Sequence, residues 1–295
     1  MLGAAAGGGF PQWNSNAEAC RRARAGDPAA RPRTQASIAV SIDDERWYLI
    51  NASPDLREQI GCSAFMHPRH ALRSSPIAGV ILTGGDVDAI AGLLTLRERQ
   101  PFTLYATSRI HAVLDANPIF EVLARDVVRR EVVALDRSTV LEDGLSFELF
   151  AVPGKTPLYL EGSDAPSIET NETTVAVALT HGTTTAFYIP GCARMTPELA
   201  VRLRGAALVF FDGTLWRDDE MVVAGLGSKT GRRMGHMSLD GADGTLAAFE
   251  NLGVARKVLI HINNSNPVLL EDSPERAHVE ARGWEVAYDG LEVRL

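Results

Sequence analysis

Ala78-Gly79-Val80-Ile81-Leu82-Thr83-Gly84-Gly85-Asp86-Val87-Asp88 is the stretch that decides the fold of this chain. Its first part, residues 78–83, is an apolar run, which predicts a β-strand buried on both faces. A helix is expected directly after it, because apolar side chains recur there at helical spacing, at Val87, Ile90, Ala91, Leu94 and Leu96. A buried strand followed by a helix indicates a sheet that is covered by helices.

The same pattern returns in the second half of the chain. A predicted helix at 196–204 leads into a buried strand at 207–211, and another at 244–252 leads into a strand at 257–261. Hairpins are also expected, because the β-rich segments 37–42 and 46–51 flank Asp43-Asp44-Glu45. Further strands are predicted at 102–106, 145–152, 173–179 and 184–189.

Buried strands that alternate with helices, together with hairpins, exclude a purely parallel sheet. Two mixed sheets packed face to face with helices outside satisfy both signals, so we predict an α/β fold of the four-layer αββα sandwich type. No Pro/Gly/Ser-rich linker divides the chain. We therefore expect a single domain over residues 1–295.

Composition limits the classes of partner. The chain of 295 residues is 45% apolar and carries a net charge of -8, which argues against a nucleic-acid-binding surface. No apolar run reaches the roughly 18 residues of a membrane span, and the N-terminus lacks the basic region of a signal peptide. Three widely spaced cysteines fit a reducing compartment. We expect a cytoplasmic protein with neither nucleic acid nor membrane as partner.

Polar residues follow the buried strands at the positions where ligands bind in α/β folds. Asp86 and Asp88 follow the first strand, Asp212 ends the second, His261 ends the third, and His236 follows a glycine-rich loop. Loops at the carboxyl ends of strands converge, so these groups are expected to lie in one cleft. Carboxylates together with imidazoles suit iron, manganese or zinc.

Each of these residues also has a structural interpretation. Asp86 or Asp88 is equally suited to cap the helix that begins there. Asp212 with Gly213 is a common turn pair. His261, at the end of an apolar strand, is compatible with a hydrogen-bonded core histidine. Taken jointly, the groups favour a metal site over these separate explanations.

Several longer segments resemble the PqqB family, within the metallo-β-lactamase superfamily. The resemblance covers essentially the whole chain, and it is carried by the segments 3–14, 31–35, 49–55, 92–98, 188–194, 211–214, 235–237 and 261–267. It implies a metallo-β-lactamase fold and a role in making pyrroloquinoline quinone (PQQ) from a peptide precursor. For this family the role is thought to be iron- and oxygen-dependent hydroxylation of the tyrosine ring in a cross-linked Glu-Tyr intermediate.

The chain departs from the superfamily pattern at the first metal position. The HxHxDH signature falls on residues 83–89, where Gly84 and Asp86 replace two histidines, Asp88 matches the aspartate and Ala89 replaces the last histidine. Lys155 stands where hydrolases of this fold usually place another histidine ligand. These departures argue against a binuclear hydrolase, and a hydrolase that uses one metal is a weaker third hypothesis because Lys155 replaces a ligand.

A second departure concerns the N-terminal segment. Many relatives carry a CxCxxC zinc motif after the Trp-Asn pair, and the corresponding positions here are Ser15, Ala17 and Cys20. Two of the three thiolates are missing, so we expect no structural zinc. Cys20 is expected to pack as a small hydrophobic residue.

The resulting hypothesis is a mononuclear iron(II) oxygenase. Asp88, Asp212 and His261 would hold the metal, Asp86 would ligate or orient it, and His236 would serve as acid/base or as a fifth ligand.

The acidic, peptide-derived Glu-Tyr substrate needs positive partners. The candidates are Lys229, Arg232, Arg233 and Arg33, with exposed surface charge as the alternative for each. The rival hypothesis is a non-catalytic carrier of PQQ or its precursor, which the loss of histidine at Ala89 favours. A homodimer is a possible assembly.

Overall fold

A computed structural model describes residues 1–141, 144–157, 159 and 168–295. Its strands form two mixed sheets, as the sequence predicts. The first sheet has the strand order β1 (Ile38–Val40), β2 (Trp47–Ile50), β3 (Ile77–Ile81), β4 (Phe102–Ala106) and β5 (Val128–Val132). Its β1–β2 pair is antiparallel, and the other pairs are parallel.

The second sheet has the order β12 (Trp284–Val286), β11 (Arg256–Ile260), β10 (Leu208–Asp212), β9 (Thr184–Ile189), β8 (Glu169–His181), β7 (Leu145–Gly154) and β6 (Ser138–Val140). The three pairs from β12 to β9 are parallel, and the three from β9 to β6 are antiparallel. The carboxyl ends of β10 and β11 therefore lie beside each other at one edge, because parallel strands point the same way.

The inner core lies between the sheets. Alternate residues of a strand point to opposite faces, so Phe210 and Ile260 join the cluster that also contains Leu49, Val80 and Leu104 of the first sheet.

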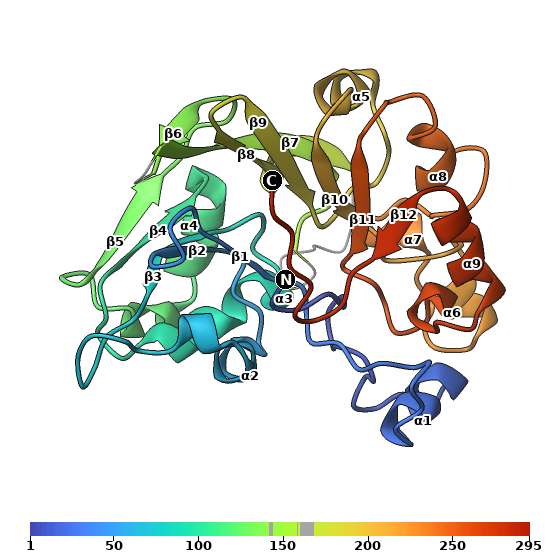
Figure 1. Ribbon diagram of the computed structural model, residues 1–295, viewed down its shortest axis with the longest axis horizontal. Coiled ribbons are helices and arrows are strands. Elements are labelled where there is room, and N and C mark those ends of the chain that lie inside the picture. The colour runs from blue at the N-terminus through green and yellow to red at the C-terminus, as the bar shows by residue number, and fades with distance from the viewer. Residues whose placement is uncertain (142–143, 158, 160–167) are drawn as a thin grey trace.

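The opposite face of the second sheet packs against helices. Val209, Phe211 and Leu259 point to that face, where they meet helices α5 (Pro197–Leu203), α8 (Thr245–Ala248) and α9 (Pro274–Ala281). Helices α2 (Leu56–Cys62) and α4 (Ser108–Asp115) cover the first sheet, so the layers follow the αββα order (Figure 1).

Two predicted helices are shorter than expected. The helix after β3 is α3 (Val87–Ile90), and a 3-10 helix continues it over Ala91–Leu96. The change from an α-helix to a 3-10 helix occurs where Gly92 lies against the backbone of the preceding loop. A Cβ on Gly92 would lie only 2.1 Å from the carbonyl oxygen of Ser53. The helix expected at 244–252 is limited to α8.

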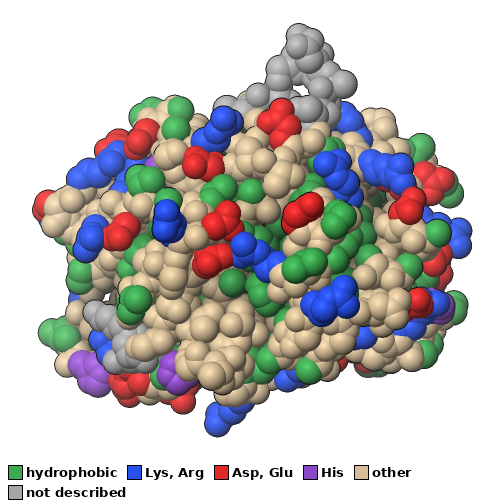
Figure 2. Space-filling model, turned by 90° about the horizontal axis from the view of Figure 1, so that it is seen from above, with side chains coloured by type: hydrophobic (Ala, Val, Ile, Leu, Met, Phe, Trp, Pro, Cys, Tyr) green, Lys and Arg blue, Asp and Glu red, His purple; other side chains and the backbone are tan. Residues whose placement is uncertain are grey.

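The remaining helices lie in long connections. They are α1 (Glu18–Arg24), α6 (Glu220–Val223) and α7 (Gly231–Met234). Cys20 of α1 is fully buried in the outer core of the second sheet, which confirms that it packs as a small hydrophobic residue. None of the helices in the described part of the chain is long and apolar enough to span a bilayer. Figure 2 shows acidic and basic side chains interspersed over one face of the molecule.

The first residues of the chain tie the two sheets together. Ala5 bridges Gln35 on one side and Ile262, just after β11, on the other. This course brings Gly7 beside Asp88, where a Cβ on the glycine would lie 3.6 Å from the carboxylate. The N-terminal segment therefore forms one wall of the site described next.

Candidate metal centre and its pocket

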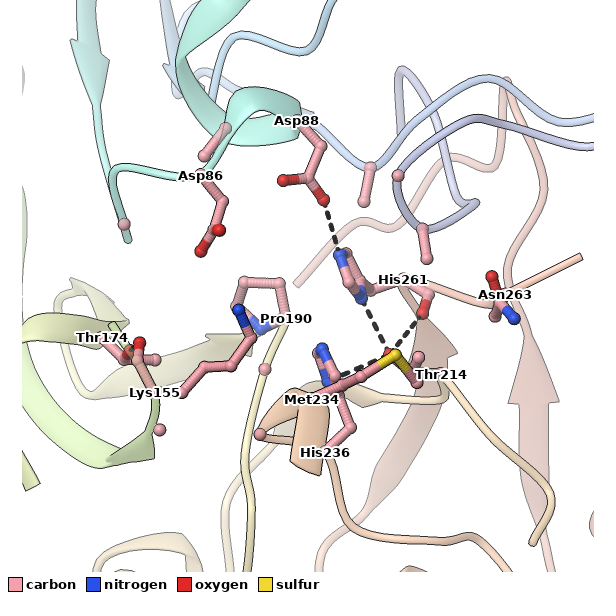
Figure 3. A pocket seen from close by; sticks show the side chains of 18 of the residues that line it. Asp86, Asp88, Lys155, Thr174, Pro190, Thr214, Met234, His236, His261 and Asn263 are labelled. Carbon is pink, nitrogen blue, oxygen red and sulfur yellow. Dashed lines mark hydrogen bonds and ion pairs between the residues drawn. The ribbon is translucent and has the colours of Figure 1, made fainter. Parts of the chain in front are cut away.

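A pocket of about 490 Å³ opens where the polar groups after β3, β10 and β11 meet. Asp86, Asp88, Thr214, His236 and His261 all line it, and Figure 3 shows their side chains converging. These side chains come from separate elements of the chain, and their convergence confirms the expectation of one shared cleft. Asp212 lies directly behind this surface, with none of its side chain exposed.

Asp212 is held by four hydrogen bonds. One carboxylate oxygen accepts from the backbone N–H and the hydroxyl of Thr214, at 3.0 and 2.6 Å. The other accepts from the N–H of Cys192 at 2.9 Å and lies 2.7 Å from Nδ1 of His236. Asp212 is therefore more than a turn residue with Gly213, because its carboxylate links three separate segments of the chain.

Thr214 connects the two imidazoles to this carboxylate. Its hydroxyl oxygen lies 2.8 Å from Nδ1 of His261 and 3.1 Å from Nδ1 of His236. The two rings are stacked, with centroids 5.2 Å apart. The sequence reasoning assigned Thr214 no role, although it belongs to the same strand-end segment as Asp212.

His261 reaches the pocket through an unusual backbone conformation. Its φ of +54° lies in the left-handed region, which non-glycine residues adopt only at an energetic cost. The turn directs the ring so that Nε2 lies 2.9 Å from an oxygen of Asp88. A residue that merely ends a core strand has no need of this conformation, so the simple core-histidine interpretation is not supported.

The charges of these groups shift one another's pKa values. Burial alone would raise the pKa of Asp212 and of Asp88, but the neighbouring histidines outweigh it and leave both pKa values lowered. Burial alone would lower the pKa of His261. The hydrogen bond to Asp88 and the negative charges of Asp88 and Asp212 outweigh burial, so the pKa of His261 is raised. Since the single hydroxyl proton of Thr214 is donated to Asp212, both ring nitrogens of His261 face acceptors. This arrangement favours the protonated ring.

The donor set fits a single divalent cation. One donor atom each of Asp212, His236 and His261 lies within 4.8 Å of the others. Ligands about 2.0–2.2 Å from a first-row metal are separated by comparable distances. The hydrogen bonds now shared within this group would be replaced by bonds to the cation, with release of a proton.

The grouping differs from the predicted one in one respect. The sequence reasoning placed Asp88 among the metal ligands and gave His236 a catalytic role. In the structure His236 is bonded to Asp212, whereas Asp88 lies beyond His261 and contacts its outer nitrogen. The compact group is therefore Asp212, His236 and His261.

Asp86 stands at the cap position of α3, but its side chain makes no capping hydrogen bond. It points into the pocket instead, on the same side as Lys155 (Figure 3). The helix-cap interpretation is thus wrong for Asp86.

The predicted substrate-binding cations fall into two groups. Lys229 lines the pocket, whereas no arginine is among the described residues that do so. The prediction for Arg33 is corrected, because its side chain is buried and donates to the carbonyl oxygens of Ala287 and Arg31, at 2.9 and 2.8 Å. Burial lowers its pKa to about 10. Arg232 and Arg233 lie on α7, outside the lining.

Comparison with known proteins identifies the family. A family model described as a beta-lactamase superfamily domain matches residues 46–262. Coenzyme PQQ synthesis protein B of Gluconacetobacter diazotrophicus is 64% identical, with 99% of this chain and 98% of that protein covered. The chain belongs to the PqqB family.

Other PqqB proteins agree over the full length. The protein of that name from Methylorubrum populi is 55% identical, with 100% of this chain and 99% of the relative covered. A crystal structure of zinc-bound PqqB from Methylobacterium extorquens has a TM-score of 0.97 and 55% identity, covering 100% of this chain and 98% of the other. A diphosphatase of the PhnP family, at 21% identity and a TM-score of 0.69, shares the fold. The metallo-β-lactamase fold predicted from the sequence is confirmed.

Proposed function

We propose that this PqqB-family protein acts in PQQ biosynthesis as a mononuclear iron(II) oxygenase. It hydroxylates the tyrosine ring of a small, peptide-derived Glu-Tyr intermediate. The observation that carries the proposal is the compact group of Asp212, His236 and His261 at the pocket. Two imidazoles and one carboxylate, with further positions open, are the donor set of many non-haem iron oxygenases.

In this proposal Asp212, His236 and His261 hold the metal. Iron(II) bound there supplies the redox chemistry that activates dioxygen. The protein's own contribution is to fix the donors and to shape the pocket. Thr214 and the N–H of Cys192 hold the carboxylate of Asp212, and Asp88 orients the ring of His261. Such outer partners typically change metal affinity 10–100-fold when they are lost.

Asp86 is our candidate for proton transfer. It lines the pocket, and Figure 3 shows its carboxylate pointing into the space that a substrate ring would occupy. A carboxylate there is suited to accept the phenolic proton of tyrosine as the ring reacts. Pro190, Val175 and Met234 add apolar surface for the ring.

The test is direct. The protein is loaded with iron(II) without oxygen, given the dipeptide Glu-Tyr and ascorbate as reductant, and then exposed to air. Mass spectrometry is expected to find products heavier by one or more oxygen atoms. His236→Ala is expected to form none, whereas His70→Ala, a surface histidine near Glu45, keeps the activity. Equal product from both variants would contradict the assignment.

A carrier that binds PQQ or its precursor unchanged is the second candidate. Ala89 favours it, since this residue lines the pocket and an alanine offers no metal ligand there. Tight binding of PQQ to the protein, with no oxygenated product under the conditions above, would favour the carrier over the oxygenase.

A further inference from the structure

The distribution of lysine in this chain is uneven. Of 29 basic residues, three are lysines, namely Lys155, Lys229 and Lys257, and the other 26 (29 minus 3) are arginines. Two of the three lysines line the pocket at the candidate metal centre. Arginine thus serves nearly everywhere else as the basic side chain, while the described part of this pocket uses lysine alone.

Lys155 is built into the pocket by its neighbours. It follows directly on β7, and its carbonyl oxygen accepts a hydrogen bond of 3.1 Å from the hydroxyl of Thr174. Its aliphatic stem packs on Gly235, where a Cβ would lie only 3.1 Å from Cγ of the lysine. Because Gly235 immediately precedes His236, the stem runs beside the metal-holding group, and Figure 3 shows it extending into the pocket.

Lys229 comes from a different part of the chain. It precedes α7 in the long connection after β10, and α7 is capped by the hydroxyl of Thr230, which accepts from the N–H of Arg233. The pocket is therefore lined by one lysine from the end of β7 and by another from this connection. The carboxylates of Asp86 and Asp88 come from the start of α3.

Two ammonium groups around one cavity attract an anion. A cavity concentrates the field of the charges that line it on a bound ligand. Asp86 lies on the same side of this cavity as Lys155, and the two lysines together outweigh its single negative charge. An ammonium is also a compact charge with three donors, so it fits a confined site where the wide guanidinium fork does not. At the metal-holding group itself, the charge of a divalent cation is balanced by Asp212 and the nearby Asp88.

We propose that Lys155 and Lys229 form a carboxylate subsite. It binds the acid groups of a small polycarboxylate and thereby directs the aromatic ring of that ligand toward Asp212, His236 and His261. The identity of the ligand as a Glu-Tyr derivative rests on the proposed function, while the subsite itself rests on the two lysines and their pocket.

Lysine footprinting tests the subsite without any turnover. The full-length protein is methylated reductively under anaerobic conditions, with and without saturating Glu-Tyr, and the modified lysines are quantified by mass spectrometry. Methylation of Lys155 and Lys229 is expected to slow severalfold with the dipeptide, while Lys257 is unaffected. Lys257 is a suitable internal control because it lies on β11 with its amine bonded to the carbonyl of Arg282. The Glu-Tyr diamide is expected to protect less.

Binding measurements with variants complete the test. Lys155→Gln and Lys229→Gln are each expected to weaken Glu-Tyr binding about tenfold, because each removes one ion pair with a carboxylate of the ligand. Lys257→Gln is expected to bind normally, and Lys155→Arg to recover only part of the affinity. Equal affinity of all variants, or equal binding of the acid and the diamide, would overturn the proposal. Protection of the lysines without any oxygenated product would support the subsite and contradict the oxygenase. Equal oxygenation of the acid and the diamide would support the oxygenase and contradict the subsite.

Discussion

The two sheets contribute unequally to the pocket. The segment after β3, on the first-sheet side, supplies Asp86 and Asp88 and no histidine. The ends of β10 and β11, from the second sheet, supply Asp212 and His261, which join His236. The carboxylate of the second sheet has no exposed surface, whereas the side chain of Asp88 remains 21% exposed.

This difference indicates that the two sheets have different roles at the centre. On the second-sheet side each donor is fixed by several bonds, as a metal ligand must be if its geometry is to be maintained. On the first-sheet side Asp88 meets the centre through a single contact, with Nε2 of His261. In the proposed function the second sheet would therefore hold the metal, and Asp88 on the first-sheet side would orient one of its ligands.

Removing the carboxylate of the second sheet is expected to have the largest effect. Asp212→Ala removes a proposed metal ligand, so we expect it to abolish metal binding. It also leaves the N–H groups of Cys192 and Thr214 without their acceptor, so we expect the free energy of unfolding to fall by about 2–4 kcal/mol. This stability loss exceeds that of a simple turn residue. Urea unfolding and metal stoichiometry measure the two effects.

Asp212→Asn separates charge from structure. Its amide oxygen still accepts from Thr214, so the unfolding free energy falls by about half as much, while the metal is still lost. Full metal content in this variant would mean that Asp212 is a structural residue, and the division between the sheets would fail.

Asp88→Asn tests the opposite side of the comparison. Because Asp88 acts through His261, we expect metal affinity to fall about 10–100-fold without being abolished. Competition with a chelating dye measures the affinity. A loss as complete as that of Asp212→Asn would make Asp88 a direct ligand, as the sequence alone suggested.

Most of the architecture follows from local patterns in the sequence. The apolar runs of β10 and β3 predict strands with both faces covered, and the structure has them. Helix lengths were less predictable, because the close passage of Gly92 against Ser53 that shortens α3 is a tertiary contact. A sequence pattern contains no information on that approach.

The site was predictable in membership and less so in geometry. Strand ends identified Asp212 and His261, but the grouping of His236 rather than Asp88 with them depends on which nitrogen of His261 faces which neighbour. That orientation is set by the left-handed backbone at His261, which the sequence does not reveal. Arg33 shows the converse error, since a basic residue near a family motif was assigned to substrate and proved to satisfy buried carbonyl groups.

Ala89→His would strengthen the first-sheet side. Ala89 is buried in α3 and lines the pocket, so an imidazole there enters the cavity next to Asp88. One further ligand is expected to tighten metal binding about tenfold, which corresponds to about 1.4 kcal/mol. Val87→His is the matched control, because Val87 is 58% exposed on the same helix. Equal affinities for the two variants would show that position 89 does not reach the metal.

Thr214→Val is expected to produce the smallest change, although Thr214 touches every member of the metal-holding group. The substitution keeps the shape and the backbone N–H that binds Asp212, and it removes only the hydroxyl between the carboxylate and the two rings. Asp212 keeps its bonds to Cys192 and His236, and His261 keeps Asp88, so the donors stay near their places. We therefore expect metal affinity to fall by less than about tenfold and the unfolding free energy by about 1–2 kcal/mol. Thr214→Ser, which restores the hydroxyl, is expected to recover the affinity, because the hydroxyl and not the methyl group joins the two rings to Asp212. Loss of affinity in the serine variant equal to that in valine would instead assign the effect to packing.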